Sequence, residues 1–256
     1  MSIFLKNATQ INAMREAGKV VFNVHEALKK AIVPGIATNE LEQISIECLK
    51  DQNAVSSFFG YEGSFGAGLY PAHICISVNE EVIHGIPGLR KLTDGDIVSI
   101  DVGAYKNGFH ADAARSYIIG SASADDKRLV EATEASFFKG LEFARVGQRL
   151  YDISEAIGDH IESQGYSVVR DFMGHGIGKS LHEDPAIPHF LPSGRGRGVR
   201  LAAGMTLAIE PMVVAGGYAV KILPDLWTVV TKDGTKSAHY ENTILITDGE
   251  PEILTM

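Results

Sequence analysis

The sequence predicts an α+β fold in which one unit, two helices followed by several strands, is used twice. Four stretches repeat apolar residues at steps of three and four, the period of an amphipathic helix, and shorter apolar runs bounded by glycine or asparagine follow each pair. The intervals also agree, because Gly95 precedes Asp101 and Gly204 precedes Glu210 by six residues each. We therefore expect a pseudo-two-fold domain with repeats of about 1–120 and 121–256, against the alternative that glycine-punctuated helices agree by chance.

In the first half, the apolar period over residues 11–30 predicts a helix. Asn7 and Gln10 stand three residues apart, so they can form a capping box at its start. Pro34 and Gly35 end this helix, and a second helix is expected over residues 38–49. Strands are expected at residues 73–78, 97–102 and 113–119, with a turn at residues 106–108.

The second half begins with Ser123, which can cap a helix over about residues 127–144. Val146 and Gly147 break that helix, and the spacing of apolar residues predicts another over residues 150–161. Strands are expected around residues 206–209, 218–222, 227–231 and 243–247. The duplication would place one carboxylate of each half, Asp101 and Glu210, at corresponding strand ends.

Composition limits the class of protein and its location. With 45% apolar and 21% charged residues, the chain has the balance of an average globular protein. A net charge of −9 argues against broad binding of nucleic acid through its phosphates. The two cysteines, Cys48 and Cys75, can form neither a disulfide framework nor a zinc ribbon. We find no signal-peptide pattern and no apolar run of membrane-spanning length, so we expect a cytoplasmic protein without a membrane partner.

Five groups form a candidate metal site. Four are carboxylates in or beside apolar strands, where an ionised group is costly unless it is compensated, and the fifth is an imidazole in a glycine-rich segment. These residues are Asp101, Asp112, His175, Glu210 and Glu241. A hairpin turning at residues 106–108 could bring Asp101 and Asp112 onto one face. Two divalent cations would cancel the formal charge of −4, and oxygen-rich ligation with one nitrogen suits Mn, Fe(II) or Co. The alternative for each acid is a buried salt bridge or a cap, but few arginines or lysines lie nearby in sequence.

Two further histidines stand beside turn-forming residues, where loops carry side chains into sites. His84 precedes Gly85, and His182 lies seven residues after His175. Either could instead be structural or exposed. The remaining histidines are interpreted as structural or surface residues: His25, His73, His110, His160, His189 and His239.

Five segments together resemble the type I methionyl aminopeptidases, the single-domain members of the pita-bread metallopeptidase family. They read CISVNEEVIHGIPG, DGDIVSIDVGAYKNGFHADAARSY, GHGIGKSLHEDP, GMTLAIEPMV and SAHYENTILIT, and they extend from Cys75 to Thr247. The resemblance implies the pita-bread (creatinase/aminopeptidase) fold, with a duplicated helix-helix-strands unit around a central antiparallel sheet. It also implies that residues 1–256 form one catalytic domain.

The resemblance further implies a role for each site residue. Asp101, Asp112, His175, Glu210 and Glu241 would be the ligands of two divalent metal ions (Mn, Fe(II) or Co). His84, His182 and Glu210 would act in catalysis, the two histidines also facing the substrate. The methionine side chain would lie among Tyr61, Tyr70, Cys75, Leu181 and Trp227. The implied activity is metal-dependent removal of the N-terminal methionine from nascent proteins and peptides, favouring a small second residue, by a monomeric enzyme.

Three positions differ from the family pattern. The link between Tyr61 and Pro71, EGSFGAGLY, is longer than usual. Leu181 stands where the family usually has an aromatic residue, and Gly103 stands where many members have threonine. These differences concern the shape of the pocket and not the metal ligands.

Two alternatives stay open at this point. One is an Xaa-Pro peptidase of the same fold, although such enzymes usually carry a separate N-terminal domain. The other is a non-catalytic pita-bread protein that binds peptide, RNA or a ribosome, although such a protein would be expected to lack metal ligands. The basic segment GRGRGVR at residues 194–200 suggests a weak contact with the ribosome, or else a solvated loop.

Overall fold

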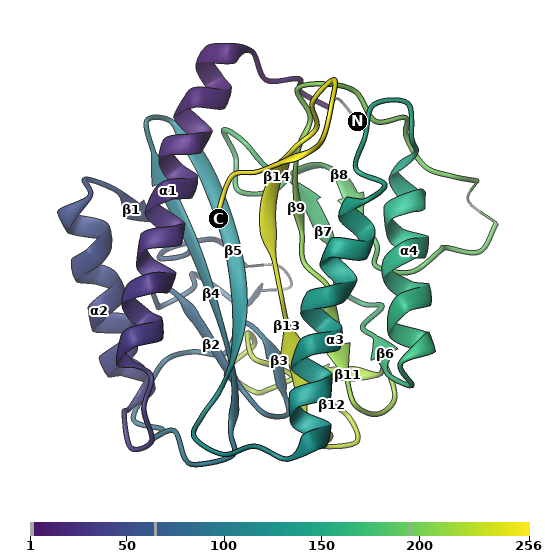
Figure 1. Cartoon of the computed structure of the whole chain (residues 1–256). Helices are drawn as coiled ribbons and strands as arrows, with labels where there is room; N and C mark the ends of the chain where they lie inside the picture. The colour runs from purple at the N-terminus through teal and green to yellow at the C-terminus, as the bar shows by residue number, and fades with distance from the viewer. Residues whose placement is uncertain (1–2, 64–65, 195) are drawn as a thin grey trace.

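The computed structural model describes residues 3–63, 66–194 and 196–256. Its strands lie between two helix pairs, with α1 (Ala8–Ala31) and α2 (Thr38–Asp51) at one side and α3 (Ala124–Leu141) and α4 (Leu150–Ser163) at the other (Figure 1). All four helices predicted from the apolar period are confirmed, with ends that differ by a few residues. In the described residues, no helix has the length and apolar character needed to cross a membrane.

The start of α1 shows why the sequence folds into a helix there. The side chain of Asn7 accepts a hydrogen bond from the backbone N–H of Gln10, and the side chain of Gln10 accepts one from the backbone of Asn7. This is the predicted capping box, which satisfies two N–H groups that a helix cannot satisfy internally. The apolar stripe of α1, including Val20, Val24 and Leu28, is buried against the strands of residues 97–118.

The first sheet is built around a long hairpin. Strand β4 (Ile97–Lys106) pairs with β5 (Phe109–Ile118), with β2 (Cys75–Val78) and with β1 (Val55–Ser56). Asn107 and Gly108 alone connect β4 to β5, with φ angles of 53° and 84°. Two positive φ angles are what a tight hairpin turn with the right twist requires, and Asn-Gly supplies them at low cost. The predicted strands and turn are therefore confirmed, and the hairpin is longer than the sequence indicated.

The second half contributes a five-stranded sheet in the order β15-β14-β9-β7-β8. Its members are β7 (Gly174–Gly176), β8 (Glu183–Ile187), β9 (Thr206–Ile209), β14 (Asn242–Leu245) and β15 (Glu252–Ile253). The predicted strands at 206–209 and 243–247 are confirmed here. The glycine-rich strand β7 and the short strand β8 were not predicted, because neither has an apolar alternation.

Two three-stranded sheets complete the fold. One has the order β13-β10-β6 and the other β11-β12-β3. Their members are β3 (Glu81–Ile83), β6 (Ser167–Val168), β10 (Met212–Val214), β11 (Val220–Ile222), β12 (Val229–Thr231) and β13 (Ser237–His239). Strands β11 and β12 are the shorter observed forms of those expected at 218–222 and 227–231. In the part of the chain that the structure describes, the antiparallel strands are thus divided among four sheets, a division that the sequence did not indicate.

The two halves meet where β5 lies beside β14. The backbone N–H of Glu241, just before β14, donates to the carbonyl oxygen of Ala114 on β5 at 2.9 Å. Thr243 on β14 then binds the backbone of Asp112 on β5 twice, its hydroxyl accepting from the N–H and donating to the C=O at 2.9 Å each. This contact between β5 and β14, the seam between the halves, brings carboxylates of both halves together.

Candidate active site

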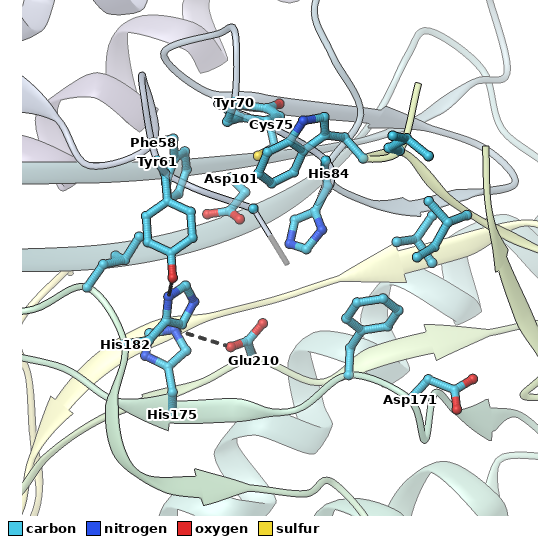
Figure 2. A pocket seen from close by; sticks show the side chains of 18 of the residues that line it. Phe58, Tyr61, Tyr70, Cys75, His84, Asp101, Asp171, His175, His182 and Glu210 are labelled. Carbon is cyan, nitrogen blue, oxygen red and sulfur yellow. Dashed lines mark hydrogen bonds and ion pairs between the residues drawn. The ribbon is translucent and has the colours of Figure 1, made fainter. Parts of the chain in front are cut away.

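A cavity of about 670 Å³ opens between the two halves. All twelve site residues named from the sequence line it, and Figure 2 shows most of them converging from different elements. They are Tyr61, Tyr70, Cys75, His84, Asp101, Asp112, His175, Leu181, His182, Glu210, Trp227 and Glu241. The cavity has an acidic, histidine-containing end and an aromatic, apolar end.

The β4–β5 hairpin positions the first two carboxylates. Asp101 on β4 lies opposite Ala114, and Asp112 on β5 lies opposite Gly103. Residues directly opposite each other in an antiparallel pair share a face, as do residues two apart along a strand. Asp101 and Asp112 therefore project from the same face of the hairpin, as predicted.

His175 faces this pair from strand β7. Its Nδ1 lies 2.8 Å from the carbonyl oxygen of Gly176, which can only accept, so Nδ1 carries the proton. The lone pair of Nε2 is then free, and Nε2 lies 3.5 Å from Oε1 of Glu210. An imidazole held through its other nitrogen is the usual arrangement of a metal-binding histidine.

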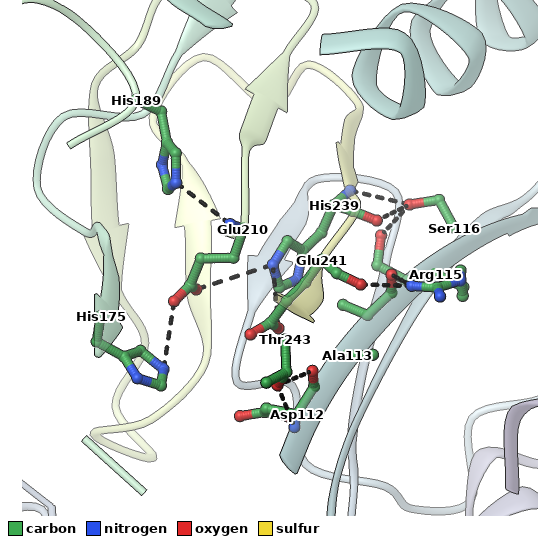
Figure 3. A network of polar contacts seen from close by, with 12 residues as sticks. Asp112, Ala113, Arg115, Ser116, His175, His189, Glu210, His239, Glu241 and Thr243 are labelled. Atoms are coloured by element: carbon green, nitrogen blue, oxygen red, sulfur yellow. Dashed lines mark hydrogen bonds and ion pairs between the residues drawn. The ribbon is translucent and has the colours of Figure 1, made fainter. Parts of the chain in front are cut away.

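The polar atoms form two overlapping groups that could each hold a cation (Figure 3). In each group the potential ligand atoms all lie within 4.8 Å of one another. One group is Asp112, His175 and Glu241, and the other is Glu210, His239 and Glu241. Asp101 lies outside both groups but is close enough to perturb the pKa of Asp112, Glu210 and Glu241.

The donor atoms fit divalent cations better than a set of salt bridges. Oδ1 of Asp101, Oδ1 of Asp112 and Oε1 of Glu241 are buried and have no hydrogen-bond partner within the described ranges. Burial raises the pKa of Asp101 to about 7, and burial together with the neighbouring carboxylates raises the pKa of Asp112 and of Glu241 well above the ordinary range. Such a cluster is stable as carboxylates only if cations compensate it.

The nearest arginine does not supply that compensation. The guanidinium of Arg115 donates to the carbonyl oxygens of Ala114 (2.8 Å) and Glu241, and to Oδ1 of Asn242 at 2.6 Å. It therefore binds the backbone behind the carboxylates and not the carboxylates themselves. The salt-bridge alternative considered for these acids has no support in this geometry.

His239 is a neighbour of the acidic cluster that the sequence did not single out. It is buried, and its Nε2 lies 3.9 Å from Oε2 of Glu210 and 4.0 Å from Oε2 of Glu241. The sequence analysis interprets it as a structural or surface histidine, and the structure places it beside two of the predicted ligands. Its place two residues before Glu241, at the end of β13, was the available signal.

The two histidines predicted to face the substrate, His84 and His182, both line the cavity and enter it from different sides (Figure 2). His84 has a left-handed backbone with φ of 59°, an uncommon conformation for a residue other than glycine, and its ring contacts Phe172 and Trp227 edge to face. Burial lowers the pKa of His84 to about 4 and also lowers the pKa of His182, so both are neutral at pH 7. The ring of His182 packs against that of His175 with centroids 4.3 Å apart.

The apolar end of the cavity is built from buried side chains. Tyr70 is 3% exposed and donates from Oη to the carbonyl oxygen of Gly85 at 3.0 Å, which leaves its ring facing Trp227 with centroids 4.9 Å apart. Cys75 and Leu181 are buried in the same apolar cluster. This end can accept a flexible apolar side chain.

Phe58 also lines the cavity and was not predicted. A Cβ atom at Gly103 would lie only 2.7 Å from the ring of Phe58 and 2.8 Å from Cβ of Ser57. The glycine therefore leaves room for the Phe58 ring. The departure from threonine at position 103 was the signal in the sequence.

The long link after Tyr61 folds back on itself at the rim. Tyr70 donates its backbone N–H to the carbonyl oxygen of Tyr61, and Gly63 donates to Gly68, at 2.8 Å each. Gly63 packs against Trp227, where a Cβ atom would lie 2.6 Å from the indole. Gly63, Ala67 and Tyr70 of this link thus form part of the cavity wall. Residues 64–65 lie outside the described residues.

The fold and this site define a metallopeptidase. The pattern of metallopeptidase family M24 matches residues 12–248, and the chain belongs to this family. It is 53% identical over 253 residues to methionine aminopeptidase 1 of Bacillus subtilis (strain 168), with 99% of both chains covered. It also matches the crystal structure of methionine aminopeptidase from Thermotoga maritima with a TM-score of 0.94 at 44% identity, again over 99% of both chains.

A more distant structural match is relevant to the Xaa-Pro peptidase alternative. Prolidase from Pyrococcus furiosus matches with a TM-score of 0.75 at 21% identity, over 98% of this chain and 65% of that one. This likeness shows a shared fold, the pita-bread architecture implied by the sequence. It carries no information about the substrate.

Proposed function

We propose that this protein removes the N-terminal methionine from proteins and peptides by metal-dependent hydrolysis. One observation carries the proposal: a single cavity joins an acidic, histidine-containing cluster to an apolar end lined by aromatic, aliphatic and thiol side chains, which suits a flexible thioether side chain. Full-length similarity to methionine aminopeptidases supports the same activity.

The proposed ligands are Asp101, Asp112, His175, Glu210 and Glu241, holding two divalent cations. Oxygen ligands with one imidazole suit Mn, Fe(II) or Co. When bound, such cations make water a stronger acid and polarise a carbonyl group. His239 groups with Glu210 and Glu241 as a further potential ligand, and its Nε2 is buried without a hydrogen-bond partner in the described residues.

The protein's own groups then have separate tasks. Glu210 accepts the proton of the attacking water, because its side chain lies between His175 and His239 at the centre of the acidic end. His182 donates a hydrogen bond to the carbonyl oxygen as that atom gains charge. His84, which enters the cavity from a different side, holds the nitrogen of the scissile bond or the backbone of the next residue.

The pocket and its entrance set the proposed specificity. Methionine in first place contacts Tyr70, Cys75 and Trp227, while Leu181 leaves more room than an aromatic residue would. Apolar pockets discriminate by only about 1–3 kcal/mol per methylene, so norleucine should also be accepted. The second residue passes between His84 and His182, which favours alanine, glycine and serine.

Metal reconstitution tests the proposal. The chelated protein should release no methionine from a Met-Ala-Ser peptide, and Mn, Fe(II) or Co should restore release. Glu210→Gln should remove turnover in the reconstituted protein. Release that persists after complete chelation would reject the metal-dependent reaction.

The same peptides distinguish the alternatives. An Xaa-Pro peptidase would cleave Met-Pro-Ser faster than Met-Ala-Ser, and a non-catalytic binding protein would cleave neither with any metal. A ribosome contact through residues 194–200 has little support, because Arg197 binds Asp152 and Arg200 donates to Gly147 (3.1 Å), while Arg195 lies outside the described residues. A monomer acting on nascent chains in the cytoplasm remains our prediction.

A further inference from the structure

The hydroxyl of Tyr61 contacts His182 at the mouth of the cavity. Oη of Tyr61 lies 2.6 Å from Nδ1 of His182, and the rings meet edge to face with centroids 5.2 Å apart. Figure 2 shows the phenol directed onto the imidazole. If Tyr61 only lined the methionine pocket, its ring would contact the substrate and its hydroxyl would have no role.

We propose that Tyr61 is a positioning residue whose hydroxyl donates to Nδ1 of His182 and thereby keeps the imidazole proton on Nε2. The inference rests on the proposed function, in which His182 donates a hydrogen bond to the substrate carbonyl. A neutral imidazole has one N–H, so a proton on Nδ1 would turn Nε2 into an acceptor. The hydroxyl of Tyr61 therefore decides whether His182 can stabilise the charge that develops on the substrate.

The two adjacent histidines have opposite partners at Nδ1, and this contrast supports the assignment. The Nδ1 of His175 faces the carbonyl oxygen of Gly176, which can only accept, so Nε2 is left with a lone pair for a cation. The Nδ1 of His182 faces a hydroxyl, which can donate, so Nε2 is left with a proton for the substrate. Each partner suits the task proposed for its histidine.

The surroundings of Tyr61 hold the hydroxyl in place and protonated. Its backbone N–H donates to the carbonyl oxygen of Phe58 and its own carbonyl accepts from Tyr70, at 2.8 Å each, so the main chain is fixed on both sides. Partial burial raises the pKa of Tyr61, which keeps the phenol a donor at neutral pH. Within the described ranges, His182 is the one hydrogen-bond partner of Oη.

Tyr61→Phe tests the inference, because it removes the hydroxyl and keeps the ring. The matched control is Tyr70→Phe, which removes the other phenol of this cavity, one that donates to backbone carbonyl oxygens and does not contact His182. Nitrogen NMR of the zinc-loaded, diamagnetic proteins reports which imidazole nitrogen of His182 carries the proton, with the signal assigned from its loss in His182→Gln. Metal content and the kinetics of Met-Ala-Ser cleavage are measured on the same variants.

We expect His182 to carry its proton on Nε2 in the parent protein and in Tyr70→Phe, and to populate the Nδ1–H form in Tyr61→Phe. The loss of an orienting partner should lower kcat by about tenfold with KM and metal content little changed. In a His182→Ala background, Tyr61→Phe should have no further effect on kcat.

Two results would overturn the inference. One is an Nδ1–H tautomer of His182 in the parent protein. The other is a Tyr61→Phe variant that keeps the parent tautomer and kcat and changes only KM and first-residue selectivity, which would make Tyr61 a pocket wall. A parent protein that cleaves no peptide with any metal would instead reject the proposed function, and the inference would fall with it.

Discussion

Glu183 directly follows His182, and its carboxylate is held by a residue from the other end of the chain. Nζ of Lys6 lies 2.6 Å from Oε2 of Glu183, and the two side chains are only 5% and 10% exposed. The backbone N–H of Lys6 also donates to the carbonyl oxygen of Gly204 at 2.8 Å. At the scale of single residues, this pair ties the N-terminal segment to the start of β8 beside the active site.

Lys6→Met should therefore lower the free energy of unfolding by about 3–5 kcal/mol, because it leaves the Glu183 carboxylate buried without its charged partner. Arg15→Met is the matched control, since it breaks the exposed ion pair with Glu252 and should cost less than about 1 kcal/mol. Urea unfolding of both variants measures the difference. Equal losses would mean that the Lys6–Glu183 pair is not buried in solution.

His25 gives a prediction about acid stability. Burial lowers its pKa to about 3, and its Nε2 lies 2.8 Å from the carbonyl oxygen of Ala113. The unfolded chain, with an ordinary pKa of about 6.5, binds this proton first as the pH falls. The contribution of His25 is therefore fully present above pH 6.5 and is lost between about pH 6.5 and 3, by up to roughly 1.4 kcal/mol per pH unit.

His25→Gln removes the titrating group and can still donate to a carbonyl oxygen. Between pH 6 and 5, its free energy of unfolding should fall less steeply than that of the parent, by up to about 1.4 kcal/mol per unit. Urea titrations at closely spaced pH values measure both slopes. Parallel slopes would show that His25 is protonated, or solvated, in the folded protein.

At the scale of elements, the packing of α1 depends on one close approach. A Cβ atom at Gly18 would lie 2.0 Å from the carbonyl oxygen of Leu254, just beyond β15, so α1 and the C-terminal segment touch through bare backbone. In the same way, β4 accommodates the Phe58 ring through Gly103. Both contacts join segments far apart in the sequence.

Gly18→Ala should lower the free energy of unfolding by about 1–3 kcal/mol, because the methyl group forces the C-terminal segment away from α1. This loss should appear although alanine is favoured over glycine in a helix by about 1 kcal/mol. Gly88→Ala is the control, with no atom within 4 Å of the added Cβ, and should be neutral or slightly stabilising. A Gly18→Ala variant more stable than the parent would contradict the contact.

At the scale of the whole molecule, the acidic cluster is assembled from both halves of the chain. Asp112 comes from β5, His175 from β7, and Glu241 from the residue before β14. Each half alone would present only part of the site. A cation held by all three would therefore stabilise the seam between the halves, in addition to any role in catalysis.

Manganese at about a hundred times its dissociation constant should add about 2.7 kcal/mol to the free energy of unfolding. For a domain of this size, that corresponds to a rise in Tm of roughly 5–10 °C. Asp112→Asn combined with Glu241→Gln removes two ligands and should abolish the rise. Calorimetry of both proteins with and without metal measures the effect, and equal shifts in both would place the cation elsewhere.

Local features were readable from the sequence because their causes are local. The four helices follow from an apolar period and caps such as Asn7, and the β4–β5 hairpin follows from the Asn107–Gly108 turn. The types and spacing of the five acidic and imidazole groups indicated a metal site, since ionised groups in apolar strands require compensation. The duplication of the two halves, and the single domain they would form, stay predictions.

Only the tertiary structure decided which residues of distant segments meet. Contacts between distant segments determine how the strands divide into sheets and where His239 lies. They also determine the packing of the Phe58 ring against Gly103 and the hydrogen bond between Tyr61 and His182. Tyr61 and His182 lie 121 positions apart. No period or local spacing encodes such a meeting, because it results from how packed helices and sheets place their side chains in space.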